Sequence, residues 1–207
     1  MIYNIVISGV GGLGILTLGR ILCQAALLSN KNAYMSEIHG LSQRYGSVVV
    51  DVRISDSKLL APVVSPGEAH LLIGLEPIEC LRVINFSGPN TDIILNTSAI
   101  PPPTVTLGVA KYPPLGEIIE TLRKVSKRIL ACGVLEEAKK LGDPRLQNTI
   151  ILGIAANIPE IPITSNSLEE AIKLAFSRDK RVQELNLKAF QRGLEIGKLL
   201  LDSMKSY

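Results

Sequence analysis

The sequence predicts an α/β fold with a mostly parallel sheet, flanking helices and a helical C-terminal third. Residues 1–8 are an apolar run, residues 9–14 are rich in glycine, and residues 15–28 carry apolar side chains at helical spacing. Further short apolar runs, many of them β-branched, alternate with connections and helical patterns up to residue 131. From Val134 onward the pattern is helical alone. A strand, a glycine turn and a helix open a βαβ unit, so we expect a Rossmann-like domain of three layers.

The composition indicates a protein with a large apolar core. The chain has 207 residues, which suits one domain spanning residues 1–207. Hydrophobic residues make up 46% and the mean hydropathy is +0.29. Either a parallel sheet buried on both faces or a surface covered by a partner explains this composition, and the sequence does not choose between them. The net charge of +3 is dispersed and aromatic residues are few, so no nucleic acid partner is expected.

The cysteines and the chain termini exclude several further classes of protein. Cys23, Cys80 and Cys132 are far apart and form no CxxC pair, so this chain alone supplies no iron–sulfur or zinc site. We expect three small buried side chains in a reducing cytoplasm. The first residues lack the basic start of a signal peptide. No apolar run reaches the roughly 18 residues of a membrane span, so no membrane association is expected.

The remaining strands and helices follow from runs and periodicity. Strands are expected at residues 33–37, 48–54, 69–75, 91–96 and 129–131. Helices are expected at residues 76–84, 115–125, 134–141, 145–157, 168–176 and 181–204. Between the second and third strands lies a ten-residue polar segment, residues 38–47, and a loop of that length normally has a functional reason.

Particular residues mark the ends and contacts of the C-terminal helices. Gly142 is a plausible C-cap, and Ser167 with Glu170 three residues later forms a capping box. Gly193 and Gly197 lie in the middle of the last helix, where each costs about 1 kcal/mol relative to alanine. Close packing against another helix would explain that cost. One face of this helix carries Leu187, Phe190, Leu194, Gly197, Leu201 and Met204.

The glycine turn is the first candidate binding site. Gly9, Gly11, Gly12 and Gly14 suit a tight turn, close approach of a ligand or another chain, and close helix–strand packing. The helix that follows offers unpaired N–H groups to a phosphate or carboxylate. Glu37 comes 23 residues after Gly14, where a dinucleotide-binding domain places an acid on the ribose. An adenosine-containing ligand is one interpretation, and glycines that serve only packing or partner approach are the other.

The polar segment after the second strand is the second candidate. Glu37, His39, Gln43 and Arg44 lie close together in it. Histidine is the side chain that most readily exchanges protons near neutral pH, which makes His39 a candidate, and Arg44 can bind a carboxylate or phosphate through two hydrogen bonds. A structural loop in which these side chains bind one another is the alternative. No catalytic triad and no metal-ligand spacing is evident in the chain.

Four segments together resemble a known family. GVGGLG at residues 9–14, SEIHGLSQR at 36–44, GSV at 46–48 and GLEPIECLR at 74–82 resemble the gamma-type domain of 2-oxoacid:ferredoxin oxidoreductases. Smaller matches are residues 95–97, Asn148 and residues 152–153. The nearest branch is the beta subunit of indolepyruvate ferredoxin oxidoreductase, and the resemblance covers nearly the whole chain. Leu13 stands where this family commonly has Gln, and Tyr45 where it commonly has Gly.

This resemblance implies a role as one subunit of an enzyme complex. The complex oxidatively decarboxylates an aryl 2-oxoacid such as indolepyruvate, with coenzyme A as acyl acceptor and ferredoxin as electron acceptor. Thiamine diphosphate, Mg and iron–sulfur clusters are held by the larger catalytic alpha subunit, so this chain binds no cofactor alone. The polar loop with Glu37, His39, Gln43 and Arg44 would then face the alpha subunit near the active site.

Three alternatives stay open on the sequence. Within the same class, the chain could be a gamma subunit of a pyruvate or 2-oxoglutarate ferredoxin oxidoreductase. A stand-alone NAD-binding protein would use the glycine turn and Glu37. An activating enzyme for ubiquitin-like proteins also begins with such a turn, but of the acids and Asn-Arg pattern expected there, only Glu37 is in place.

Overall fold

The computed structural model describes residues 1–40 and 46–204, and these residues build one six-stranded sheet. The strands are β1 (Ile2–Val10), β2 (Asn32–His39), β3 (Ser47–Ser55), β4 (Leu71–Gly74), β5 (Asp92–Asn96) and β6 (Arg128–Cys132). Their order in the sheet is β2-β3-β1-β4-β5-β6. β3 runs antiparallel to both of its neighbours, while β1, β4, β5 and β6 pair in parallel. Because β3 alone is reversed, the prediction of a mostly parallel sheet is confirmed.

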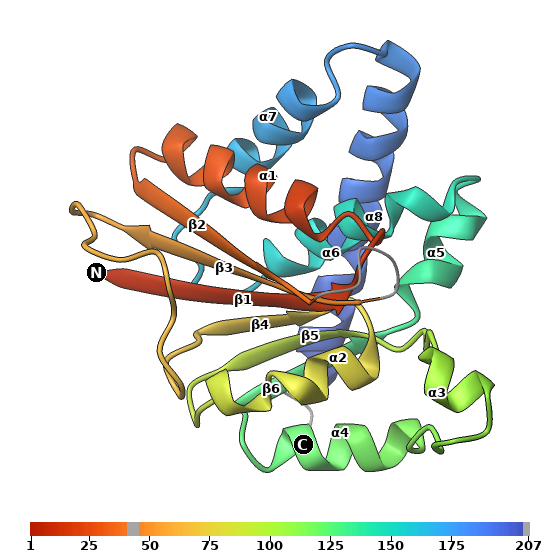
Figure 1. The fold of residues 1–207 in the computed structure, drawn as a ribbon. Helices are drawn as coiled ribbons and strands as arrows, with labels where there is room; N and C mark the ends of the chain where they lie inside the picture. The colour runs from red at the N-terminus through yellow and green to blue at the C-terminus, as the bar shows by residue number, and fades with distance from the viewer. Residues whose placement is uncertain (41–45, 205–207) are drawn as a thin grey trace.

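Helices cover the two faces of the sheet unequally (Figure 1). The helices are α1 (Ile15–Leu28), α2 (Pro77–Arg82), α3 (Pro103–Thr106), α4 (Leu115–Arg123), α5 (Val134–Lys140), α6 (Gln147–Ala155), α7 (Ser165–Ala175) and α8 (Lys180–Met204). One apolar cluster joins the sheet to α1 and α5–α8, and a second joins it to α2 and α4 on the opposite face. The three layers and the helical C-terminal third are therefore as predicted.

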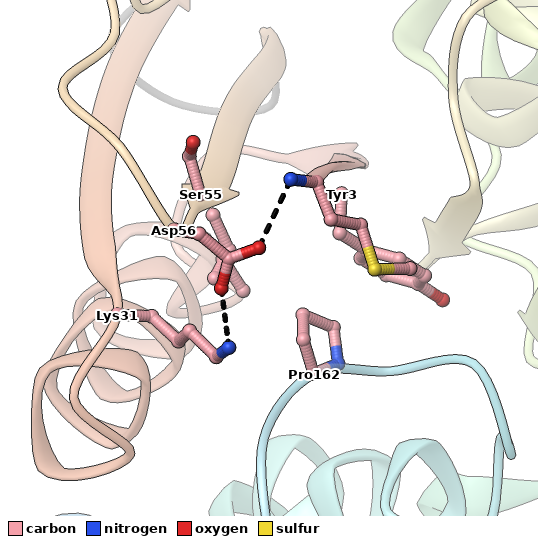
Figure 2. A pocket seen from close by; sticks show the side chains of 7 residues that line it. Tyr3, Lys31, Ser55, Asp56 and Pro162 are labelled. Carbon is pink, nitrogen blue, oxygen red and sulfur yellow. Dashed lines mark hydrogen bonds and ion pairs between the residues drawn. The ribbon is translucent and has the colours of Figure 1, made fainter.

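An ion-pair cluster ties together three segments at the amino edge of the sheet (Figure 2). The Met1 amino group donates to Asp56 Oδ2 at 2.9 Å, and Lys31 Nζ donates to Asp56 Oδ1 at 2.5 Å. The hydrogen bond from Lys31, followed by that from the N-terminus, lowers the pKa of Asp56 from 3.8 to about 2. The cavity beside the cluster measures about 10 Å³, which leaves no room for a ligand.

Because the pKa of Asp56 is lowered in the folded chain, the contribution of its carboxylate to the free energy of unfolding depends on pH. Because the pKa is lower in the folded chain than its ordinary 3.8, the stabilisation is complete above that value and is lost as the pH falls through about 2. We expect Asp56→Asn to lower the melting temperature slightly at pH 7, since exposed pairs contribute little. That difference should shrink between pH 4 and pH 2. Thermal unfolding of both proteins across this range measures it, and a difference that grows in acid would contradict the assignment.

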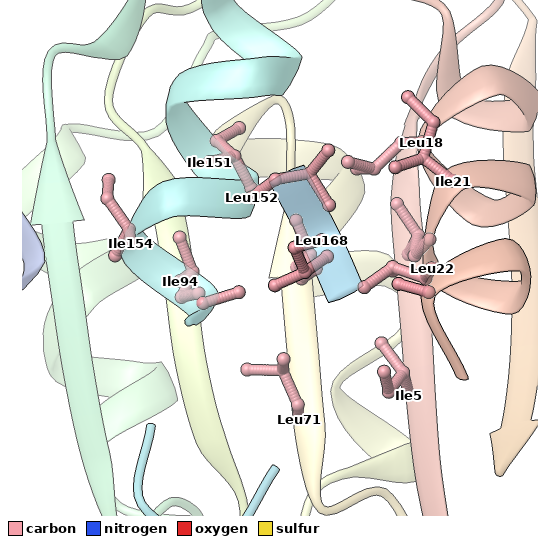
Figure 3. Close-up of a cluster of buried hydrophobic side chains, with 14 of the residues drawn as sticks. Ile5, Leu18, Ile21, Leu22, Leu71, Ile94, Ile151, Leu152, Ile154 and Leu168 are labelled. Atoms are coloured by element: carbon pink, nitrogen blue, oxygen red, sulfur yellow. The ribbon is translucent and has the colours of Figure 1, made fainter. Parts of the chain in front are cut away.

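The main core lies between the sheet and the C-terminal helices (Figure 3). Side chains of β1, β4, β5, α1, α6 and α7 meet there, and each is at most 4% exposed. Figure 3 labels Ile5, Leu18, Ile21, Leu22, Leu71, Ile94, Ile151, Leu152, Ile154 and Leu168. All nine residues of α6 are buried, apart from the half-buried Asn148. A helix that is buried on all sides is surrounded by other elements, so α6 forms the centre of the helical layer.

Glycines bring α8 into direct contact with α6. A Cβ added to Gly193 would overlap the carbonyl oxygen of Ile150 and lie 2.8 Å from the Cα of Gly153. A Cβ on Gly197 would lie 3.0 Å from the Cα of Ile154. The close packing expected from the two glycines of α8 is thereby confirmed, and it explains their cost in helix propensity.

Two details of the C-terminal helices differ from the predictions. Thr164, rather than Ser167, caps α7, and its hydroxyl oxygen accepts from the Ser167 N–H at 3.1 Å. The predicted face of α8 is also wrong in part, because Met204 is exposed and the predicted leucines are only half-buried. Phe190 and Gly197 of the predicted face are buried, and the other buried residues are Asn186, Ala189, Gly193 and Ile196. Small side chains face α6 because the two backbones touch, and the leucines flank that contact.

Candidate functional site at the carboxyl edge of the sheet

The candidate site lies where the strands of the parallel half end. β1 leads into α1 on one face of the sheet, and β4 leads into α2 on the other. Adjacent parallel strands whose helices leave to opposite faces open a crevice at their carboxyl ends, which is where α/β sheets bind ligands. The glycine turn follows β1, and Glu76 follows β4. The Leu75 N–H donates to the Ser8 carbonyl at 2.8 Å, so these two strand ends are held together.

The predicted tasks of the glycines fall on different residues. Gly9 is the last but one residue of β1, and a Cβ there would lie 3.0 Å from Leu75 Cβ and 3.1 Å from Ile15 Cδ1. Gly9 therefore serves strand–helix packing. Gly12 and Gly14 have φ angles of +98° and +75°, which other residues rarely adopt. A Cβ on Gly12 would have no heavy atom within 4 Å, so open space lies over this backbone.

A backbone hydrogen bond joins the glycine turn to the polar loop. The Gly11 N–H donates to the Gly46 carbonyl at 2.8 Å. The Gly40 N–H donates to the Ser47 carbonyl at 3.0 Å and closes the β2–β3 hairpin. Both candidate segments therefore share the carboxyl edge of the sheet. Because the Gly11 N–H is already bonded, it is not a free donor for a phosphate.

Of the four candidate side chains of the polar loop, the structure describes those of Glu37 and His39. Gln43 and Arg44 lie outside the described residues. Glu37 and His39 stand at the end of β2, with side chains 44% and 48% exposed and His39 Nε2 3.7 Å from Glu37 Oε2. β3 separates β2 from β1, which puts Glu37 two strands, or about 10 Å, from the glycine turn. The structure does not bring the acid next to the glycine turn, as a ribose-binding acid would require.

Asn148 supports the glycine turn from the start of α6. Its Nδ2 donates to the Leu13 carbonyl at 2.7 Å, while its buried Oδ1 has no hydrogen-bond partner among the described residues. The Leu13 side chain packs against the core, which accounts for an apolar residue at this position. A cavity of about 340 Å³ opens beside the turn. Its lining includes Gly12, Gly14, Thr17, Arg145 and Asn148. In the sequence, Asn148 stands out only as one of the smaller matches to the family that the chain resembles.

Glu76 is a buried carboxylate at the same edge, and the sequence analysis assigned it no role. It is 1% exposed, and its Oε2 accepts from the Glu79 N–H at 2.9 Å. Its Oε1 accepts from the Ile100 N–H at 3.2 Å and from the Tyr112 hydroxyl at 2.5 Å. The sequence signal for this role is an acid placed between an apolar strand and a proline. At that position an acid caps the helix that the proline begins, so its carboxylate is held by the helix.

The cysteines do not fit a metal cluster. Cys23 lies in α1 and Cys80 in α2, on opposite sides of the sheet, and Cys132 ends β6. Only Cys80 is buried, so the prediction of three buried cysteines is wrong for Cys23 and Cys132, which are half-buried. Burial raises the pKa of all three thiols, that of Cys23 to about 11, whereas iron and zinc bind the thiolate. Within residues 1–40 and 46–204, no three His, Cys, Asp or Glu side chains gather as metal ligands would. No helix in that part of the chain is long and apolar enough to cross a bilayer.

Comparison with known proteins identifies the family. The family described as pyruvate ferredoxin/flavodoxin oxidoreductase matches residues 4–196. The chain belongs to that family. A relative from Archaeoglobus fulgidus, named indolepyruvate oxidoreductase subunit IorB, is 43% identical over 92% of both chains. A protein of the same name from Pyrococcus horikoshii is 35% identical over 97% of this chain and 98% of its own.

Solved structures of this family share the fold. The gamma subunit of a keto/oxoacid ferredoxin oxidoreductase from Geobacter sulfurreducens has a TM-score of 0.68 at 24% identity, over 95% of this chain and 99% of its own. A 2-oxoglutarate:ferredoxin oxidoreductase from Magnetococcus marinus has a TM-score of 0.76 at 18% identity, over 96% of this chain. This chain spans only 31% of that longer protein. The resemblance stated from the sequence is confirmed at the level of family and fold.

Proposed function

We propose that this chain is the smaller, cofactor-free subunit of an indolepyruvate:ferredoxin oxidoreductase. The observation that carries this proposal is identity of 32–43% to four subunits named for indolepyruvate oxidoreductase, over 92–97% of this chain. Relatives named as 2-oxoglutarate synthase subunits are 26–29% identical, which favours the aryl 2-oxoacid. The reaction converts the 2-oxoacid anion and coenzyme A into acyl-CoA, CO₂ and a proton, and two electrons pass singly to ferredoxin.

In this proposal the chemistry belongs to the larger catalytic alpha subunit. Thiamine diphosphate with Mg supplies the carbanion stabilisation, and iron–sulfur clusters supply the one-electron path, all in that subunit. The cysteines of the present chain support this assignment, because all three lie apart, Cys80 is buried, and Cys23 and Cys132 are half-buried. We infer that it is inactive alone and works in the cytoplasm, where its cysteines stay reduced.

The contribution of this chain is an ordered edge presented to the alpha subunit. The bond from Gly11 holds Gly46, at the end of the polar loop, beside the glycine turn, and Glu37 and His39 stand exposed where the loop begins. The open backbone at Gly12 allows another chain or the coenzyme A path to approach. We assign Glu37, His39, Gln43 and Arg44 to the loop that completes the active site, and the open glycine backbone at Gly12 to partner or ligand approach.

Affinity purification from native extract tests the proposed assembly. We expect the tagged chain to retain a brown companion, roughly threefold larger, whose visible absorbance comes from iron–sulfur clusters. The companion's iron content and its mass by denaturing electrophoresis identify it. A colourless chain that purifies alone and binds NAD saturably would contradict the proposal and favour the nucleotide-binding alternative.

A further inference from the structure

A rigid proline arm projects from the carboxyl edge of the sheet. We define it as residues 97–114, which join β5 to α4 and contain α3 (Figure 1). Five prolines restrict its backbone, and it contains one lysine and no acid. None of the residues of α3 is buried. The arm therefore stands away from the core although it starts beside the candidate site.

The tip of the arm is apolar and exposed. Leu107 and Val109 are each 77% exposed and flank Gly108, whose φ angle is +73°. The N–H groups of Val109 and Ala110 both donate to the Thr104 carbonyl, at 2.9 and 3.1 Å. The two apolar side chains are therefore presented on a closed turn rather than on a free strand.

Glu76 holds both ends of the arm. Its Oε1 accepts from the Ile100 N–H near the start of the arm and from the Tyr112 hydroxyl near its end. Burial, together with the hydrogen bond to Glu76, raises the pKa of Tyr112. The phenol therefore stays protonated, and its O–H donates a hydrogen bond to the carboxylate. A buried carboxylate is expensive unless it is fully bonded, and here its bonds position a surface element.

We propose that the proline arm is the element by which this chain docks on the larger subunit, with Leu107 and Val109 entering an apolar pocket there. This inference rests on the proposed function. The arm starts at the end of β5, at the same carboxyl edge as the glycine turn, with β4 between β5 and β1. Gly46, at the end of the polar loop, lies at that edge beyond the turn. One partner surface that spans the edge would meet all three. Its rigidity lowers the entropy lost on binding.

The relatives and the size of the tip favour this occupant over a second copy of the chain. In a ketoisovalerate oxidoreductase subunit from Methanothermobacter thermautotrophicus, the matching region covers 91% of this chain but 35% of the relative. The domain is there covalently joined to further chain. Two side chains also fall far short of the roughly 800 Å² per partner that a stable dimer buries. They suit an anchor within a larger interface with a different subunit.

Binding of arm variants to the larger subunit tests the inference. The tagged full chain is co-expressed with that subunit, and the dissociation constant of the purified pair is measured by titration. We expect L107S/V109S to weaken binding at least tenfold, with an unchanged melting temperature of the isolated chain because both side chains are exposed. The matched control is L27S/L28S, which removes two exposed leucines at the amino-edge end of α1 and should bind as the unmodified chain does.

A second variant tests the support of the arm. Tyr112→Phe removes only the hydroxyl that Glu76 accepts from, and it should weaken binding while leaving the apolar tip intact. Unchanged binding by L107S/V109S, or equal weakening by L27S/L28S, would overturn the inference. Loss of self-association by L107S/V109S with unchanged binding to the larger subunit would also overturn it and identify a second copy as the occupant. If the unmodified chain itself binds no larger subunit, the proposed function fails instead.

Discussion

Replacing Gly193 by alanine is expected to lower the free energy of unfolding by about 2 kcal/mol or more. The new Cβ would overlap the Ile150 carbonyl oxygen and approach the Gly153 Cα to 2.8 Å, so α8 must move away from α6. Overpacking costs about 1–3 kcal/mol, and against backbone atoms it outweighs the gain of about 1 kcal/mol in helix propensity. Urea unfolding followed by circular dichroism measures the change.

The matched control for this variant is Gly116→Ala, a second glycine inside a helix. A Cβ on Gly116 would meet no atom within 4 Å, so only the propensity gain remains. Its midpoint should equal or exceed that of the unmodified chain. Equal stability of Gly193→Ala and the unmodified chain would show that α6 and α8 do not touch through their backbones.

Replacing Gln43 and Arg44 together by alanine is expected to reduce turnover of the assembled enzyme by at least about tenfold. Both residues belong to the polar loop that we assign to the partner's active site, and the described end of that loop, Gly46, is bonded to the glycine turn at Gly11. Misplacing or losing a positioning group at an active site costs up to about 10²-fold in rate. Steady-state oxidation of indolepyruvate with coenzyme A and a ferredoxin measures the effect.

The control for this pair is Arg123→Ala with Gln191→Ala. Both residues are exposed on helices outside the candidate edge, at the end of α4 and within α8. This variant should assemble and turn over as the unmodified enzyme does. Unmodified turnover with alanine at both Gln43 and Arg44 would remove the loop from the active site, while the assignment of the chain as a subunit would stand.

Local patterns predicted most of the fold because each depends on neighbouring residues. The predicted apolar runs form strands in the structure. Gly142 has a φ angle of +95° and follows α5, as expected of a left-handed residue at a helix C-terminus. The mid-helix glycines of α8 indicated a close helix contact, and α6 supplies it. The cap of α7 was assigned one turn late because Ser167, as well as Thr164, has a capping hydroxyl and the first turn is too polar to show periodicity.

The order of the strands and the environment of Glu76 could not be read in the same way. A period-two pattern does not show which strand lies beside which, so the insertion of β3 between β1 and β2 was not foreseen. That insertion separates Glu37 from the glycine turn. The hydrogen bond that Glu76 accepts from Tyr112, 36 residues away, is a long-range contact that no local pattern around Glu76 indicates. The four-residue helix α3 begins at the third of three consecutive prolines and is too short to show a period.

The most direct test of the central claim is the turnover of the larger subunit with and without this chain. Purified larger subunit, loaded with its cofactors, is titrated with the purified chain while indolepyruvate-dependent reduction of ferredoxin is recorded in the presence of coenzyme A. We predict no turnover by this chain alone and a rise that saturates at a fixed stoichiometry. Pyruvate and 2-oxoglutarate should support slower turnover. Full activity of the larger subunit without the chain, with no change on its addition, would contradict the account.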